Sequence, residues 1–333
     1  MYYTASSIGT GMQCPKLYKF KYVELYRTKP SIHMFLGTSL HAGLEKFFTG
    51  FDYEHAKRHM LKTFEEYEED NGDDEVNRAR LRAYLKGYYN RWESKRDEEV
   101  KDSVIFVEQE FQFEHEGIEF RGKWDALAYD PSTKTATIYE HKTTGLSLES
   151  VADPYFDKLP MDIQCTIYRE AAFVWLNTNG YMLFEMPRLV YDVIKKTKAS
   201  PKMKKRVVKR KTETEEEFQK RKEEQMETLE EFEERLMESY LNEGPYFRHE
   251  IPLITTHHKR RLNELKEYAK LLSNKGFLEI RNSTSCGNYG GCDFLGVCLG
   301  RELLDDSTKI FKQEEKHPEL DGKGNTVLYP ISL

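Results

Sequence analysis

Acidic and basic side chains that could do chemistry together lie near the middle of this sequence. Glu140 and Lys142 are two residues apart in a stretch with the pattern of a β-strand, so both side chains project from one face of it. Asp125 lies on the preceding expected strand, across a short hairpin. Two carboxylates and a lysine can therefore converge, and carboxylate oxygens are the ligands that Mg²⁺ and Mn²⁺ prefer.

A divalent cation held there would lower the pKa of a bound water molecule and stabilise the transition state of phosphodiester hydrolysis. Lys142 would orient that water or neutralise developing charge. The alternative is an ordinary surface ion pair on a strand, because an Asp, a Glu and a Lys at this spacing often occur together by chance.

Four of the five cysteines lie at the two ends of the chain. Cys14 is near the start, whereas Cys286, Cys292 and Cys298 are evenly spaced near the end. A single distant cysteine with a C-terminal triplet is unusual for disulfides, and it favours a metal cluster that ties the two ends together. The odd cysteine count and the absence of a signal-peptide pattern in residues 1–6 indicate a reducing compartment, so we expect a cytoplasmic protein, or one in the host cytoplasm if it is viral.

The bulk composition is that of a soluble globular protein. The 333 residues are 32% charged and 38% hydrophobic, with a net charge of −6, so total charge gives no support to nucleic-acid binding. No apolar run approaches the ~18 residues needed to span a membrane.

Hydrophobic periodicity predicts a mixed α/β protein. Apolar residues at helical spacing predict helices at 36–48, 54–98, 160–177 and 257–275, the second one broken near residues 71–73. Period-two alternation predicts three adjacent antiparallel strands at 104–113, 118–129 and 135–143, and a further strand at 189–195. We detect no internal repeat.

A strongly charged stretch follows the last of these strands. Residues 195–211 carry basic side chains and no acidic one, and the chain turns acidic from Glu213. We expect 200–242 to be an inserted, solvent-exposed helical arm. Its basic run either contacts DNA phosphates or is a solvated loop balanced by the acidic helix after it. The aromatic residues Tyr18, Phe20, Tyr22 and Tyr26 either stack on unpaired bases or pack a small domain.

The order of these segments resembles the RecB-type branch of the PD-(D/E)XK nuclease superfamily. Four motifs carry the resemblance: GTSLH at 37–41 with Glu45, GKWD at 122–125, EHKTT at 140–144 and QCTIY at 164–168. Trp124 stands where the superfamily often has a proline, which is usual in this branch.

The resemblance implies roles for single residues. It implies that His41, Asp125 and Glu140 bind the metal, with the main-chain carbonyl of His141 nearby, and that Lys142 is the catalytic lysine. It also implies that Gln164 and Tyr168 face the DNA from one side of a helix, and, more weakly, that Glu110 is an outer acidic contributor.

One subgroup of this family carries an iron–sulfur cluster, with one cysteine before the nuclease core and three after it. It includes the nuclease domains of AddB-type proteins and the CRISPR-associated exonucleases. The segment CPKLY at 14–18 and the triplet at 286–298 resemble its pattern, which implies a [4Fe–4S] cluster on Cys14, Cys286, Cys292 and Cys298. The gap between the first two cysteines of the triplet is longer than the family's, so tetrahedral zinc and unligated thiols remain alternatives.

We therefore expect a PD-(D/E)XK core with a central mixed sheet flanked by helices. The expected units are a cluster subdomain formed by both termini (1–30 and 276–300), the core (31–199), the charged insertion (200–243), a return to the core (244–275) and a polar tail (301–333).

The expected function is metal-dependent exonuclease action on single-stranded or frayed DNA ends. It would serve recombination, repair or replication, including that of a virus or mobile element, with a helicase or recombination protein as partner and no membrane. The rivals are a non-catalytic DNA-binding protein of the same fold and a zinc-stabilised structural subunit whose carboxylates form only ion pairs.

Overall fold

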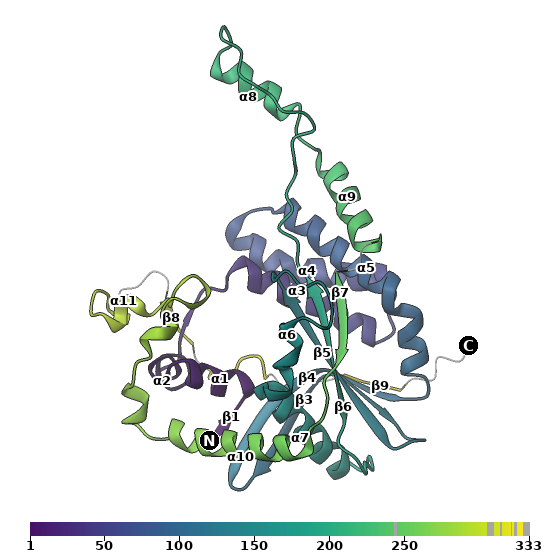
Figure 1. Ribbon diagram of the computed structural model, residues 1–333, viewed down its shortest axis with the longest axis vertical. Coiled ribbons are helices and arrows are strands. Elements are labelled where there is room, and N and C mark those ends of the chain that lie inside the picture. The colour runs from purple at the N-terminus through teal and green to yellow at the C-terminus, as the bar shows by residue number, and fades with distance from the viewer. Residues whose placement is uncertain (243–244, 305–309, 314, 321, 323–324, 329–333) are drawn as a thin grey trace.

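A mixed β-sheet forms the centre of the computed structural model, which describes residues 1–242, 245–304, 310–313, 315–320, 322 and 325–328. Within these residues the sheet has seven strands in the order β7-β6-β5-β4-β3-β9, and β1 pairs with β4 outside this path (Figure 1). The strands are β1 (Tyr2–Tyr3), β3 (Val104–His115), β4 (Ile118–Asp130), β5 (Thr135–Thr144), β6 (Arg188–Lys195), β7 (Tyr246–Glu250) and β9 (Asn325–Leu328). The β1–β4 and β5–β6 pairs are parallel and the others antiparallel, which confirms the expected mixed sheet.

Helices cover both faces of the sheet, as expected for this class of fold. Neighbouring residues of one strand alternate between two hydrophobic clusters: Phe106 belongs to the first, and Ile105 and Val107 belong to the second. The first face packs against α1 (Ala5–Gln13), α7 (Ile163–Thr178) and α10 (Thr255–Leu272), and the second against α3 (Ile32–Phe48), α4 (Tyr53–Asn71) and α5 (Glu75–Glu99). Short helices are α2 (Pro15–Tyr18), α6 (Pro154–Asp157) and α11 (Leu295–Cys298).

The break predicted near residues 71–73 is confirmed, and its cause is local. Gly72 follows the last residue of α4 with a φ of +82°, a conformation that favours glycine. The Asp74 side chain then accepts a hydrogen bond from the Asn77 N–H at 3.0 Å and caps α5. The chain therefore forms two helices where the hydrophobic pattern is nearly continuous.

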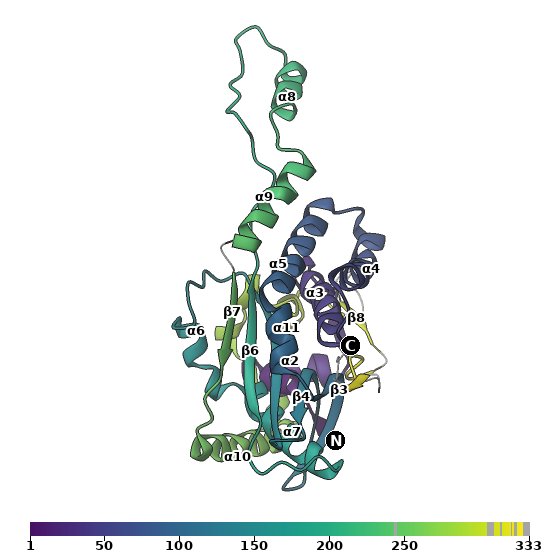
Figure 2. The same cartoon turned by 90° about the vertical axis from the view of Figure 1, so that its right-hand side faces the viewer.

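The charged insertion contains two helices, α8 (Glu215–Glu223) and α9 (Leu229–Asn242), and only one of them is the exposed arm that we expected. The distal part with α8 extends away from the body in both views (Figures 1 and 2). None of the α8 residues is buried. By contrast, α9 buries Phe232, Leu236 and Tyr240 in the second cluster, so the expectation of a wholly solvent-exposed insertion was wrong.

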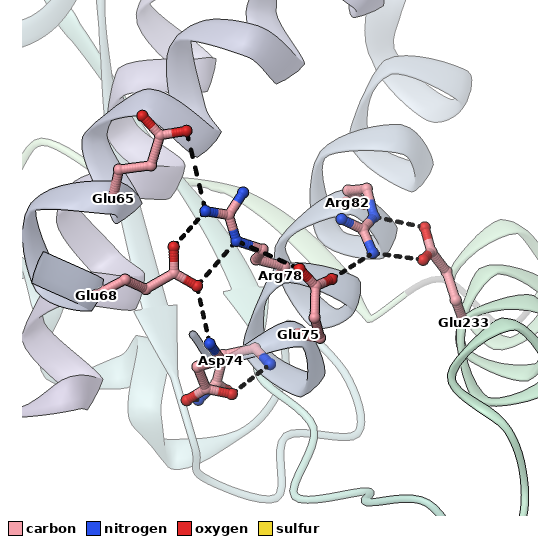
Figure 3. Close-up of polar contacts among 8 residues, drawn as sticks. Glu65, Glu68, Asp74, Glu75, Arg78, Arg82 and Glu233 are labelled. Atoms are coloured by element: carbon pink, nitrogen blue, oxygen red, sulfur yellow. Dashed lines mark hydrogen bonds and ion pairs between the residues drawn. The ribbon is translucent and has the colours of Figure 1, made fainter. Parts of the chain in front are cut away.

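Polar contacts fix the base of this arm on the body. Arg82 of α5 donates two hydrogen bonds to Glu233 of α9, each at 2.6 Å (Figure 3). Beside them Arg78 pairs with Glu68 of α4, so α4, α5 and α9 are linked by carboxylate–guanidinium contacts. Bidentate pairs of this kind add directional specificity to the hydrophobic contact.

The two arm helices are copies of one short motif, which corrects the expectation that the chain has no repeat. The pattern E-T-x-E-E-F-x-x-R occurs at 213–221 and again at 227–235. In each copy the threonine and the third residue after it form reciprocal capping bonds, and the arginine binds the first glutamate with two hydrogen bonds. The copies differ in their phenylalanine: Phe232 is fully buried, whereas Phe218 is partly exposed.

The two ends of the chain meet in a small region beside the sheet. β2 (Tyr26–Thr28) pairs with β8 (Ile310–Lys312), and a third hydrophobic cluster joins Leu17 and Phe20 to Phe294 and Ile310. Ile310–Lys312 and Asn325–Leu328 thus form strands within the stretch that the sequence indicated as a polar tail, because β8 and β9 pair with strands of two sheets.

Within the described residues, none of the helices is both long and apolar enough to cross a membrane.

Candidate active site

Register and helix position bring the predicted catalytic residues together. Ala126 of β4 is opposite Tyr139 of β5, so the preceding Asp125 and the following Glu140 are neighbours across the pair. His41 comes from α3 on the second face of the sheet. Helix α7 starts after Asp162, whose side chain caps it by accepting a hydrogen bond from the Gln164 N–H at 2.8 Å.

These residues line a cavity of ≈ 510 Å³. His41, Asp125, Glu140 and Lys142 lie in its wall, which confirms that these side chains converge, although their chemical roles stay predictions. The remaining lining residues come from α1, β4, α7 and the C-terminal segment: Thr4, Ala5, Ser6, Gly9, Gly122, Lys123, Asp162, Ile163, Gln164, Tyr168, Glu319 and Leu320.

Gly122 is needed beside this cavity for a steric reason. A β-carbon at this position would collide with the ring of Phe111 on the neighbouring strand. The glycine of the GKWD motif therefore lets Phe111 pack against Trp124, at a centroid distance of 4.5 Å, directly before Asp125.

Asp125 is held in its charged form by its neighbours. Burial would raise its pKa, but the charge and hydrogen bond of His41, with His141 and Lys142, outweigh burial and keep the pKa of Asp125 below its usual range. The His41 Nδ1 lies 3.4 Å from Asp125 Oδ1, and the His141 N–H donates to Oδ2 at 2.7 Å. In turn burial lowers the pKa of His41, but Asp125 raises it by more.

Glu140 has one oxygen in use and one without a partner. Its Oε1 accepts hydrogen bonds from Lys142 Nζ at 2.5 Å and from Gln164 Nε2 at 2.6 Å. Its Oε2 is buried with no hydrogen-bond partner. Burial and then repulsion by Asp125 raise the pKa of Glu140 to about 7. A buried acceptor in this state is costly unless something pairs with it.

That unpaired oxygen fits a cation, and so do the donors around it. Asp125 and Glu140 supply hard carboxylate oxygens and His41 supplies an imidazole nitrogen, a set suited to Mg²⁺ or Mn²⁺. As the side chains stand, the described part of the chain contains no group of three His, Cys, Asp or Glu that could hold a metal ion. Lys142 and Gln164 both bind Oε1 of Glu140, so a metal would be bound through Oε2 once Asp125, Glu140 and His41 move closer together.

Gln164 and Tyr168 lie where the sequence predicted them. Both line the cavity from one side of α7, and Tyr168 packs edge-on against Phe111 at 5.3 Å between ring centroids. The pKa of Tyr168 is raised well above its usual value by burial, so its hydroxyl stays protonated. A contact with DNA remains a prediction for both.

His141 faces away from the cavity, as the alternation of a strand requires. Its ring packs against Phe48 and Tyr88, both ring nitrogens are buried without hydrogen bonds, and burial lowers its pKa to about 4. Its contribution to the site in this structure is the main-chain N–H given to Asp125.

Sequence analysis named Glu110 as an outer acidic contributor, a role that stays a prediction, and Glu108, which also lies outside the cavity wall, is a second acidic residue of β3 that interacts with the charge of Asp125. Glu110 accepts a hydrogen bond from the Gly322 N–H at 2.6 Å and is not part of the cavity wall. Glu108 has a φ of +51°, which interrupts the β3–β4 pairing without changing its register, and its side chain pairs with Lys123 at 2.6 Å. Burial and the Asp125 charge raise its pKa.

The four terminal cysteines also converge. Cys14, Cys286, Cys292 and Cys298 line one cavity of ≈ 340 Å³ between the two ends of the chain. None forms a disulfide, and together with the rest of the described chain they make no group that could hold a single metal ion. The fifth cysteine, Cys165, is buried in α7, where burial raises its pKa to about 12.

The family comparison identifies the class of protein. Residues 2–298 match the PD-(D/E)XK nuclease superfamily, so the chain belongs to this superfamily. No curated protein matches the sequence.

Among solved structures, one of a candidate exonuclease from Eubacterium rectale is similar at 11% identity and a TM-score of 0.48, covering 97% of this chain and 94% of that one. The structure of SSO0001 is similar at 14% identity and a TM-score of 0.29, covering 81% and 97%.

Proposed function

We propose that this protein is a metal-dependent DNA nuclease whose catalytic residues are Asp125, Glu140 and Lys142. The observation that carries the proposal is Glu140 Oε2, a buried carboxylate oxygen without a partner in a cavity that it shares with Asp125 and His41. Membership of the nuclease superfamily supports the same reaction.

Each side chain then has a distinct task. Asp125, Glu140 and His41 would hold Mg²⁺ or Mn²⁺, and a cation bound there acidifies a water molecule and offsets charge on the phosphate. Burial lowers the pKa of Lys142, but Glu140 and Asp125 raise it by more, so its ammonium stays charged. That ammonium positions the attacking water and neutralises the developing charge on the phosphate. Gln164 and Tyr168 position the strand from α7.

Within this class we propose an exonuclease that acts on single-stranded or frayed ends in recombination, repair or replication. A cavity of ≈ 510 Å³ is in the range that holds a small ligand, and so has room for a nucleotide at the cleaved bond. A helicase or recombination protein as partner and a cytoplasmic location belong to this proposal.

We further propose that Cys14, Cys286, Cys292 and Cys298 hold a [4Fe–4S] cluster with a structural role. Their convergence from positions that are far apart in sequence supports this, and thiolates are the ligands of such clusters. Zinc is the alternative, and metal analysis of the purified protein decides between them.

The direct test is cleavage of end-labelled single-stranded and duplex DNA with Mg²⁺ or Mn²⁺, with and without EDTA. We expect a ladder or release of label only when the metal is present. Binding of DNA with no metal-dependent product would support the non-catalytic DNA-binding alternative. A protein that neither binds nor cleaves DNA would support the structural subunit.

A further inference from the structure

The C-terminal segment crosses the edge of the catalytic cavity. Glu319 and Leu320 line this cavity together with Thr4 and Ala5 at the start of α1 and with the catalytic residues themselves. They come from residues 315–320, which lie between β8 in the small terminal region and β9 on the central sheet.

On one side this segment is anchored in a cluster of tyrosines. Lys316 Nζ donates to the carbonyl oxygen of Tyr2 at 3.1 Å and lies 5.4 Å from the ring centroids of Tyr2 and Tyr3. Burial lowers its pKa to about 8. The carbonyl oxygen of Lys316 accepts a hydrogen bond from Arg27 at 3.0 Å. A lysine ammonium is rarely buried beside aromatic rings unless it makes specific hydrogen-bond and cation–π contacts there.

His317 strengthens the same anchor. It is 3% exposed, and its ring lies 5.3 Å from the ring centroid of Tyr2 and 5.2 Å from that of Tyr22. Its Nδ1 is 2.9 Å from Glu319 Oε1, so the buried histidine also orients the carboxylate at the cavity.

On the other side the chain is anchored on the sheet. The Gly322 N–H donates to Glu110 on β3, and residues Asn325–Leu328 pair with Val104–Val107 of the same strand. The segment at the cavity is therefore held at both ends, by the N-terminal tyrosines and by the edge of the sheet.

We propose that residues 315–320 form a strap that restricts the catalytic cavity to a single, unpaired DNA strand. This inference rests on the proposed nuclease function. The strap is a wall of the cavity, and its Glu319 side chain is 52% exposed there. A duplex would bring a second phosphate backbone toward that wall, where the strap blocks it and the carboxylate repels it.

The test compares cleavage of one labelled strand, alone and in a blunt duplex, by the full chain and by a strap variant. The variant Lys316→Ala with His317→Ala removes the anchor without touching the cavity wall. The matched control is His258→Ala with Lys259→Ala, an adjacent pair on α10 outside the cavity, in which the buried histidine also contacts a glutamate. We expect the preference for the single strand to fall at least ~10-fold in the strap variant and to stay unchanged in the control.

A second variant guards against loss of folding. Glu319→Gln with Leu320→Ala changes two side chains that are not buried and should lower the same preference in part, with an unchanged melting temperature. Equal cleavage of both substrates by the native chain, or an unaltered preference in both folded variants, overturns the strap.

Failure of the proposed function gives a different result. If the native chain cleaves neither substrate with Mg²⁺ or Mn²⁺, the nuclease proposal fails, and fluorescence anisotropy of the same two oligonucleotides in EDTA then tests the strap alone. Tighter binding of the single strand that is lost in the strap variant supports the strap, whereas equal binding of both overturns it.

Discussion

At the scale of single residues, two carboxylates in one cavity are kept in different states. His41 and the His141 N–H stabilise the charged form of Asp125, whereas burial and the charge of Asp125 favour the protonated form of Glu140. The folded pKa of Glu140, about 7, is above its usual value of 4.5. Stability from this group is therefore present below about pH 4.5 and is lost as the pH rises through 7.

A pH dependence of metal binding follows from this state. A cation must displace the proton of Glu140, so we expect the Mg²⁺ or Mn²⁺ concentration for half-maximal cleavage to rise up to ~10-fold per pH unit as the pH falls below 7. Metal titrations of the cleavage rate between pH 5.5 and 8.5 would measure this. A half-maximal concentration that does not change with pH would place the metal away from Glu140.

Replacing His41 by alanine tests whether this histidine is a metal ligand or only packs against its neighbours. We expect His41→Ala to raise the Mn²⁺ concentration needed for cleavage at least ~10-fold while DNA affinity changes little, because one nitrogen ligand is lost. His59→Ala on the neighbouring α4 is a control, since His59 is not part of the cavity wall. An unchanged Mn²⁺ titration for His41→Ala would mean that the imidazole only packs.

Sequence reasoning found the residues of this site whose positions follow from a regular period. Asp125 and Glu140 follow strand alternation, and Gln164 and Tyr168 follow the turn of a helix. It missed Glu108, because the φ of +51° at this residue interrupts the β3–β4 pairing there, while the register is the same on both sides of it. The unusual φ of Glu108 has no signature in the sequence.

At the scale of elements, the repeated arm motif offers a matched pair of substitutions. Phe232→Ala empties a fully buried position between α9 and α5 and should lower the free energy of unfolding by about 3 kcal/mol. Phe218→Ala in the equivalent position of α8 should change it by less than about 0.5 kcal/mol, because no α8 residue is buried. Urea unfolding of both variants would measure the difference, and equal losses would show that α8 also packs.

The arm shows why the pattern of one helix cannot tell what covers it. The two copies share caps, charges and a phenylalanine, so the sequence made both look solvated. Of the two helices, α9 packs against α5. The ring of Tyr240 on α9 contacts that of Tyr84 on α5, and Glu233 on α9 accepts a hydrogen bond from Arg82 on α5. Removing 203–226 should therefore leave the core folded, whereas removing 200–240 would expose the second hydrophobic cluster.

At the scale of the whole molecule, the N- and C-terminal segments pack on each other and on the core. Three contacts bring together residues that are far apart in sequence. They are the cavity lined by the four cysteines, the pairing of β2 with β8, and the pairing of β9 with β3. The cysteine spacing predicted the first of these links, but short polar strands such as Ile310–Lys312 have too little pattern to be found without their partners. Their order comes from tertiary contacts rather than from local sequence.

Loss of a single cysteine should therefore affect the whole fold. We expect Cys14→Ser and Cys292→Ser each to remove bound iron and to lower the melting temperature by roughly 5 °C or more, because the ends are no longer tied. Cys165→Ser should keep the iron, since Cys165 does not line the cavity of the other four cysteines and is buried in α7. Iron and zinc content with calorimetry on anaerobically purified protein would decide, and an iron-free but equally stable native protein would contradict the proposal.

The central claim is that Glu140 in its cavity cleaves DNA through a bound divalent metal. It is tested most directly by single-turnover cleavage of end-labelled single-stranded DNA by the native protein, Glu140→Gln and the exposed control Glu149→Gln, with Mn²⁺. Glutamine keeps the shape and the contact with Lys142 but is a much poorer ligand for the metal, so we expect at least a ~100-fold loss for Glu140→Gln and none for Glu149→Gln. Cleavage by folded Glu140→Gln at the native rate would contradict the account.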